Sequence, residues 1–131
     1  MKPGLLPGIR ETMEVRVTRD MTAAFGGVEV HPVLSTVSMV YYMEWVGRRI
    51  LLPYLEEHEE GVGGVISVRH RAPAPVGCSV IFTAEVVKVK LNKVICRVQA
   101  EHTKAIIGEG EFVQAVLPKR VIEERIRDMK Q

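Results

Sequence analysis

One long helix pattern followed by a series of strand patterns with short links limits the folds that this chain can adopt. The stretch TVSMVYYMEWVGRRILLPYL, residues 36–55, carries apolar residues at three- and four-residue steps, the period of an amphipathic helix. After Gly61 apolar and polar residues alternate instead, as in strands. Short links between those strands exclude a doubly wound parallel fold, because parallel neighbours need long crossover connections.

Four strands are expected after the helix. In the first, GVGGVISVRH, a period of two places five residues on one face: Val62, Gly64, Ile66, Val68 and His70. The prolines of RAPAPVG then interrupt the pattern, because they withhold backbone donors. The remaining strands are approximately CSVIFTAEVVKV, KVICRVQAEHT and IIGEGEFVQAVLP, and their short links predict an antiparallel meander.

Before the helix, one half-buried strand is expected from Thr12, because Met13, Val15 and Val17 alternate with polar residues. The glycine-rich stretch AAFGGVEVHPVLS, residues 23–35, is expected to be a loop or lid. The tail KRVIEERIRDMK has the spacing of a short amphipathic helix.

This order predicts an α+β hot-dog fold, in which a curled antiparallel sheet wraps around one long central helix. The 131 residues, 47% of them hydrophobic, fit a single domain spanning residues 1–131. One helix cannot cover both faces and the open edge of such a sheet, so we expect a homodimer. The pattern does not decide between a dimer and a tetramer.

Charge and composition exclude several classes of partner. The formal charge is only +2 and the basic residues are scattered, which argues against nucleic acid binding. The opening MKPGLLPGIR lacks the apolar core of a signal peptide, and the helix contains Glu44, Arg48 and Arg49, unlike a membrane span. We therefore expect a cytoplasmic protein with no membrane partner.

Neither the cysteines nor the acidic run indicate a metal or redox cofactor. Cys78 and Cys96 lie in apolar strand patterns without a second ligand at metal-binding spacing, so both are expected to be reduced core residues. The run EEHEEG, residues 56–61, is expected to form a solvated turn.

Glu44 stands between Met43 and Trp45, where apolar packing is expected. Such a carboxylate either forms a surface pair with Arg48 or Arg49, as at i,i+4 spacing, or belongs to a functional site. Residue spacing alone leaves the two interpretations open.

Two further polar groups bear on that choice. His70 lies in register with an apolar strand face and is either a satisfied core residue or a site residue. Thr36 either caps the helix, together with or instead of Ser35, or directs its hydroxyl at a substrate. Because eight helical residues rise about 12 Å, Thr36 and Glu44 cannot touch on one straight helix. Either Thr36 folds back, or the site is shared between two copies.

The blocks VLSTVSMVYYMEWVGRRILLPYL and GVGGVISVRHRAPAPVG, within residues 33–77, resemble the fluoroacetyl-CoA thioesterase-like group of hot-dog proteins. The resemblance implies that T-x6-M-E-W and V-x-H place a catalytic set on Thr36, Glu44 and His70. It also implies that the backbone amide of Gly63 faces the thioester carbonyl. Thioester hydrolysis needs a base, an activated nucleophile and donors for an oxyanion, which these residue types supply.

The chain departs from that group in its lid, where the fluoroacetyl-specific members carry phenylalanines. Val30 stands at one such position and the nearest aromatic residue is Phe25. We therefore predict a hydrolase for short or medium acyl-CoA thioesters rather than one selective for fluoroacetyl groups. Coenzyme A would enter as part of the substrate, with no metal or redox cofactor.

The predicted substrate pocket is bounded by Val37, Tyr41 and Val68. The basic residues Arg69, Arg71 and Lys93 are candidates for contacts with the phosphates of coenzyme A. Two alternative functions remain open: an acyl-CoA binding module without turnover, and a hot-dog enoyl-CoA hydratase or dehydratase.

Overall fold

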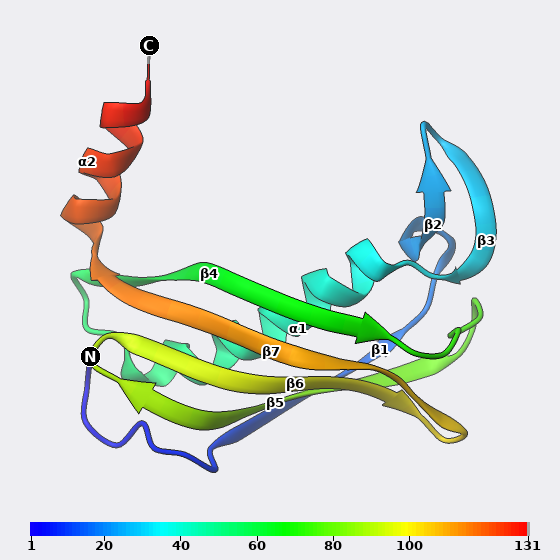
Figure 1. Ribbon diagram of the computed structural model, residues 1–131, viewed down its shortest axis with the longest axis horizontal. Coiled ribbons are helices and arrows are strands. Elements are labelled where there is room, and N and C mark those ends of the chain that lie inside the picture. Colours follow the sequence, from blue (N-terminus) through cyan, green and yellow to red (C-terminus); the bar gives the residue numbers. More distant parts are fainter. Residues whose placement is uncertain (131) are drawn as a thin grey trace.

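Five antiparallel strands form the main sheet of the computed structural model, which describes residues 1–130 (Figure 1). Their order is β1-β5-β6-β7-β4, so β1 and β4 are the two edges. The bounds of the strands are β1 Arg10–Arg16, β4 Glu59–His70, β5 Ser79–Lys90, β6 Lys93–His102 and β7 Ala105–Pro118. The predicted strand after Thr12 and the predicted meander of β5, β6 and β7 are both present.

One face of the sheet is apolar and holds the core. Alternate residues of β5 and β6 are buried: Val80, Phe82, Ala84, Val86, Val94, Cys96, Val98 and Ala100. Cys96 thus belongs to the core as expected, and burial raises the pKa of its thiol to about 11. Cys78 is also a free thiol but is only half-buried, because it lies in the turn before β5 rather than on the core face of a strand.

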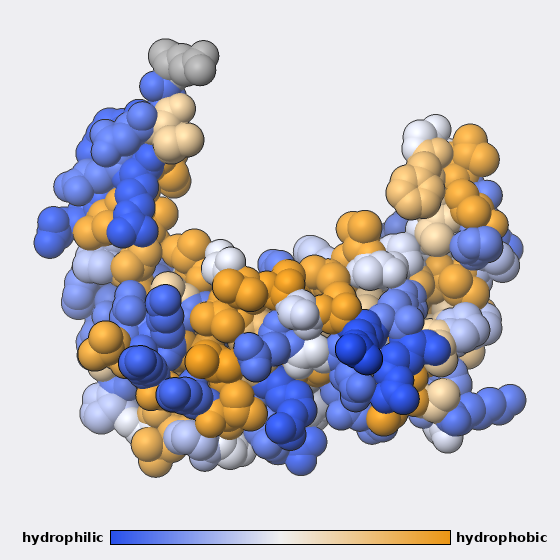
Figure 2. Space-filling view, viewed as in Figure 1, coloured by the Kyte–Doolittle hydropathy of each residue, from blue (hydrophilic) through white to orange (hydrophobic). Residues whose placement is uncertain are grey.

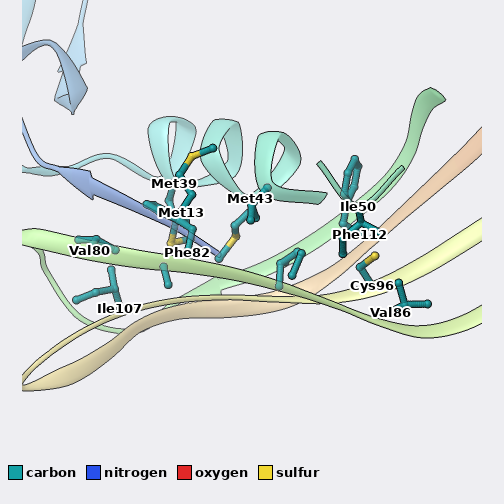
Figure 3. Packing of buried hydrophobic residues seen from close by; sticks show 14 of the residues in the cluster. Met13, Met39, Met43, Ile50, Val80, Phe82, Val86, Cys96, Ile107 and Phe112 are labelled. Atoms are coloured by element: carbon teal, nitrogen blue, oxygen red, sulfur yellow. The ribbon is translucent and has the colours of Figure 1, made fainter. Parts of the chain in front are cut away.

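The long helix α1, Thr36–Leu51, packs against this face, and the short 3-10 turn η2, Leu52–Tyr54, follows it. The side chains that α1 contributes to the core include Met39, Met43 and Ile50 (Figure 3). Val37 does not belong to this core-facing side of α1, since it is 77% exposed. Val37 lies two residues before Met39, which puts the two on opposite sides of a helix.

A second, exposed stripe therefore runs along α1, formed by Val37, Tyr41 and Trp45. These residues repeat every four positions, so they lie on one side of the helix. The helix has apolar residues on two sides, and the sheet of its own chain covers only one of them.

The stretch predicted as a loop, residues 23–35, is mainly a two-stranded hairpin. Its strands are β2, Thr22–Phe25, and β3, Val28–Leu34, which follow the 3-10 turn η1, Arg19–Met21. The turn is Gly26-Gly27, and both glycines have positive φ values, 60° and 81°. A Gly-Gly pair permits this tight turn because glycine tolerates positive φ, so it closes a hairpin rather than marking irregular chain.

Edge strand β4 has a bulge between Gly63 and Val65. The bulge breaks the expected alternation, because an extra residue reverses the side on which the preceding residues lie. Ile66, Val68 and His70 remain half-buried on one side, whereas Val62 and Gly64 are exposed.

The predicted C-terminal helix is α2, Lys119–Met129. Figure 1 shows α2 and the β2–β3 hairpin projecting past β4 on the same side, from opposite ends of the molecule. Apolar side chains line much of the surface between these two projections (Figure 2). Within residues 1–130, no helix is both long enough and apolar enough to cross a bilayer.

Candidate active site

The side chains of Thr36 and His70 meet where α1 begins and β4 ends. Oγ1 of Thr36 lies 2.8 Å from Nδ1 of His70, although the residues are 34 positions apart in the sequence. The adjoining chain is held by a bridge between Val33 and Pro75 and by bonds from the amides of Arg71 and Ala72 to the carbonyl of Ile107. The fold therefore brings together two of the three predicted site residues.

Helix capping does not explain Thr36. Ser35 is the N-cap, and its hydroxyl accepts a hydrogen bond of 3.0 Å from the amide of Ser38. Thr36 is the first residue of α1 and is exposed. Its hydroxyl is thus available to His70 and to a bound molecule, and the capping interpretation of Thr36 is wrong.

His70 is half-buried, and this decides its charge. Burial lowers the pKa of the imidazole from its ordinary value of 6.5, while a hydrogen bond with the backbone of Ala72 partly opposes the effect. At neutral pH the ring is therefore neutral, so one of its nitrogens can accept a proton. When that nitrogen is Nδ1, it can accept the proton of the Thr36 hydroxyl.

Glu44 lies in a different place from this pair. It is exposed, and it lines two adjoining cavities of about 340 and 250 Å³. The predicted i,i+4 pair does not form, because Arg48 binds Glu60 through two bonds of 2.8 and 3.1 Å. Arg49 lies over the Trp45 ring instead, 5.8 Å from its centre.

A single chain does not bring Glu44 to His70. Thr36 and Glu44 are separated by eight residues of continuous α1, a rise of about 12 Å. Within residues 1–130, the side-chain carboxylate of Glu44 forms no hydrogen bond or salt bridge. The carboxylate and the Thr36–His70 pair are therefore two separate parts of the surface of one copy.

The larger cavity includes residues that the sequence did not indicate as a site. Gly63 and Tyr41, both predicted, line it together with Trp45, Arg48, Gly61, Phe112 and Gln114. In the sequence Trp45 fits the apolar pattern of the helix, so nothing there indicated a site. Gln114, however, falls on the buried face of β7, and a lone amide at a core position could have been noticed.

The other predicted binding residues are more scattered. Val30 and Val37 are exposed, and Val68 is half-buried on β4. Two of the candidate phosphate partners lie near acidic groups, because Arg71 forms a 2.9 Å salt bridge with Glu109 and Arg69 shares a shallow cavity with it.

Lys93 lies at the other end of the sheet from His70. The register pairs Lys93 with Ala115 of β7, whereas His70 pairs with Gly108. Among residues 1–130, no group of three or more His, Cys, Asp or Glu side chains is arranged to hold a metal ion.

Comparison with known proteins relates this geometry to a family. Residues 17–120 match the family model described as fluoroacetyl-CoA-specific thioesterase. The chain belongs to this family. The fluoroacetyl-CoA thioesterase of Streptantibioticus cattleyicolor is 35% identical over 99 residues, which are 76% of this chain and 71% of that protein.

Solved structures confirm the hot-dog thioesterase fold. A thioesterase superfamily member from Thermus thermophilus is 39% identical, with a TM-score of 0.92 over 97% of this chain and 94% of that one. A variant of the fluoroacetyl-CoA thioesterase in complex with acetyl-CoA is 30% identical, with a TM-score of 0.87 over 96% of this chain and 99% of that one. Members of the fluoroacetyl-CoA-specific thioesterase family are thioester hydrolases, and this chain is an enzyme of that class.

Proposed function

We propose that this enzyme hydrolyses short or medium acyl-CoA thioesters, with Thr36, Glu44 and His70 as its reacting groups. The observation that carries the proposal is the 2.8 Å contact between the Thr36 hydroxyl and a neutral, half-buried His70. A hydroxyl beside a neutral imidazole is the usual arrangement of a nucleophile, or of a group that positions water, and its base.

The reaction adds water across the C–S bond, giving a free acid and the thiol of coenzyme A. In one route His70 takes the proton of Thr36, whose oxygen attacks the carbonyl carbon, and the thiolate leaves with that proton before water releases the acyl group. In the other route the same base activates water directly. The amides of Thr36 and Val37 are in the same first turn of α1 and would suit the developing oxyanion, because a helix leaves its first N–H groups without partners in the helix. The next amide, that of Ser38, is already bonded to the Ser35 hydroxyl.

Glu44 joins the site, on this proposal, from a second copy of the chain. Two exposed apolar surfaces support such a dimer. The first is the exposed stripe of α1, which includes Val37 and Tyr41, and the second is the β4 edge, which includes Val62 and Val65. The opposite edge, β1, carries Arg10, Glu11, Glu14 and Arg16, and charges of this kind discourage edge-to-edge pairing. The β4 edge is therefore the one that we assign to the dimer.

The direction of pairing follows from the same surfaces. A two-fold axis perpendicular to the sheet pairs β4 antiparallel with its copy and keeps both α1 helices on one side of the joint sheet. An axis along the strands would put the two helices on opposite sides, so their exposed stripes could not share an interface. The antiparallel arrangement allows both stripes to be covered at once.

The cavity lined by Tyr41, Trp45 and Phe112 is the region that we assign to the acyl group and its linker. Its volume of about 340 Å³ exceeds what an acetyl-sized group needs, which favours acyl chains of short to medium length. Gly63 lies at its edge, where a backbone amide can approach a thioester. Arg69 and Arg71 stay candidates for the phosphates, weakened by the neighbouring Glu109.

The test is release of free thiol from acetyl-, fluoroacetyl-, branched- and medium-chain acyl-CoAs by the wild type, Glu44→Ala and His70→Ala. Glu57→Ala, an exposed carboxylate in the turn before β4, is the matched control. We expect both site variants to lose turnover and the control to keep it. Hydrolysis unchanged in both would refute the assignment.

Two other outcomes point to the alternative functions. Acyl-CoA binding by calorimetry without any thiol release would indicate a binding module. An absorbance change with enoyl-CoA, without thiol release, would indicate a hydratase or dehydratase.

A further inference from the structure

Two elements at opposite ends of the molecule are too small to be stable alone. Helix α2 has 11 residues and none of them is buried, whereas isolated helices shorter than about 12–15 residues are marginal in water. The β2–β3 hairpin forms a sheet of only two strands, which is also marginal by itself. Each element therefore needs apolar cover beyond what residues 1–130 of the same chain give it.

Helix α2 forms one side of an apolar groove with β4 and β7, here called the α2 groove. Its volume is about 390 Å³. Ile122, Ile126 and Met129 lie on one side of the helix, because they are spaced by four and three residues. Ile126 is 55% and Met129 83% exposed. The remaining lining residues are Val62, Leu117 and Arg125.

The hairpin exposes a matching set of apolar side chains, here called the hairpin tip. Phe25 is 75%, Val28 67% and Val30 54% exposed. Phe25 and Val28 flank the Gly-Gly turn and pair with each other, and Val30 follows two residues later on β3. Exposed apolar residues gathered at one point of a surface usually mark a contact with another molecule. In Figure 2 the hairpin and α2 rise from the same side of the molecule.

The two elements are attached to opposite ends of β4. Helix α2 begins directly after Pro118, which pairs with Glu59, the first residue of β4. The hairpin runs into Thr36, which contacts His70, the last residue of β4. Antiparallel pairing of β4 with its copy places the start of each strand beside the end of the other. Each α2 is thereby brought to the end of the dimer that carries the hairpin of the partner.

We propose that the hairpin tip of each copy docks in the α2 groove of its partner. This inference rests on the β4-edge dimer of the proposed function and adds an occupant for a groove that the reaction does not use. Because a two-fold interface is isologous, the contact forms twice, once at each end. The hairpin leads directly into Ser35 and Thr36, so the C-terminal helix of one copy would steady the segment that carries the hydroxyl of the other.

Cysteine cross-linking of the full-length chain tests the contact. In a Cys78→Ala background, Phe25→Cys and Met129→Cys are made singly and together, while Cys96 stays because it is buried. We expect a short bismaleimide to give a covalent dimer with the double variant and with an equal mixture of the two single variants. Either single variant alone should stay uncross-linked.

The outcomes separate this contact from the dimer and from the reaction. Cross-linking of Met129→Cys alone would place two α2 helices together and overturn the proposal. A dimer by light scattering without any cross-link between residues 25 and 129 would also overturn it, yet leave the proposed function standing. A monomer by light scattering would overturn the docking and the shared site together.

Hydrogen exchange gives a second readout that needs no substrate. Ile126→Ser removes an apolar side chain from the α2 groove, and Glu124→Ser makes the same new residue on the other side of α2. We expect faster amide exchange in residues 22–34 for Ile126→Ser only, with the dimer intact. Equal exchange in both variants would contradict docking of the hairpin.

Discussion

Gly47 of α1 and Phe112 of β7 touch so closely that a Cβ atom on Gly47 would lie 2.6 Å from the Phe112 ring. The same glycine accepts, through its carbonyl, a 2.9 Å hydrogen bond from the buried amide of Gln114. Phe112 and Gln114 also line the cavity beside Glu44. The spacing between helix and sheet at this point therefore sets the shape of the cavity.

Gly47→Ala is expected to destabilise the protein despite the better helix propensity of alanine. The propensity gain is at most about 1 kcal/mol, whereas overpacking a core typically costs about 1–3 kcal/mol. Thermal unfolding of Gly47→Ala, Phe112→Leu and the double variant measures the effect. The double variant should lose less stability than the two single losses added together; strict additivity would show that the methyl group and the ring do not collide.

The hydroxyl of Thr36 is expected to matter for turnover and not for stability. Thr36→Val keeps the shape but removes the hydroxyl, so kcat should fall by about 10²-fold or more. Thr36→Ser should keep measurable activity. Neither variant of Thr36 should change stability much, because Ser35 is the residue that caps α1. Ser35→Ala is the matched control and should lower the free energy of unfolding by about 0.5–2 kcal/mol. Full activity in Thr36→Val would remove the hydroxyl from the mechanism.

Burial of His70 predicts the acid limb of the pH profile. Its pKa is lowered from 6.5, mainly by burial, and only the neutral ring accepts a proton. The value of kcat/KM should therefore fall as the pH drops below 6.5, with its midpoint on the acid side of that value. A midpoint above 6.5 in the wild type would contradict His70 as the base.

The same shift has a consequence for stability. A histidine whose folded pKa is lowered binds its proton more readily when unfolded, so stability rises with pH. This contribution is complete above 6.5 and is lost as the pH falls through the folded pKa. Chemical unfolding at pH 7.5 and pH 5 should show a smaller decrease for His70→Gln than for the wild type, other groups being unchanged.

Gln114 is expected to couple the core to the cavity. It is 3% exposed, and Gln114→Leu removes its bond to Gly47 while filling nearly the same volume. Loss of this hydrogen bond should cost about 0.5–1.5 kcal/mol, since the Gly47 carbonyl loses its side-chain donor but stays within the backbone hydrogen bonding of α1. The KM and kcat values of Gln114→Leu and the wild type are measured with acetyl-CoA and with hexanoyl-CoA. If the substitution changes KM more than kcat, and changes it differently for the two substrates, its effect lies in the acyl cavity. Unchanged KM values would show that Gln114 acts on stability alone.

Much of the fold could be predicted because alternation and helical period report burial directly. On β5 the buried residues Phe82, Ala84 and Val86 are separated by Thr83 and Glu85. Met43 and Ile50 share one side of α1. The hairpin was missed because the paired glycines and Pro32 were interpreted as signs of a loop, although residues 28–31 alternate between apolar and polar types. The period of α1 also does not show which apolar residues face the sheet, because the helix has apolar residues on two sides.

The site was only partly predictable. Residue spacing left a structural alternative for each of Thr36, Glu44 and His70, and only the family resemblance joined them as one set. Contacts between α1 and β4 could not be predicted, because they depend on how the sheet curls. The structure places Thr36 against His70 and leaves Glu44 at a separate cavity. Hydrophobic periodicity also does not show which residues of a second copy lie nearby. The proposed partner of Glu44, His70, belongs to that second copy.

Mixed dimers test whether Glu44 acts across the interface. In a Glu44→Ala and His70→Ala pair, one of the two shared sites combines an intact Glu44 from one chain with an intact His70 from the other. Random exchange of equal amounts puts half of the protein in mixed dimers, each with one of two sites restored, so activity should recover to about a quarter of the wild type. If each chain holds a complete site, mixing restores nothing. Val65→Lys in both chains should abolish the recovery, because a charge on the exposed β4 edge opposes pairing, while Glu14→Lys on β1 should not.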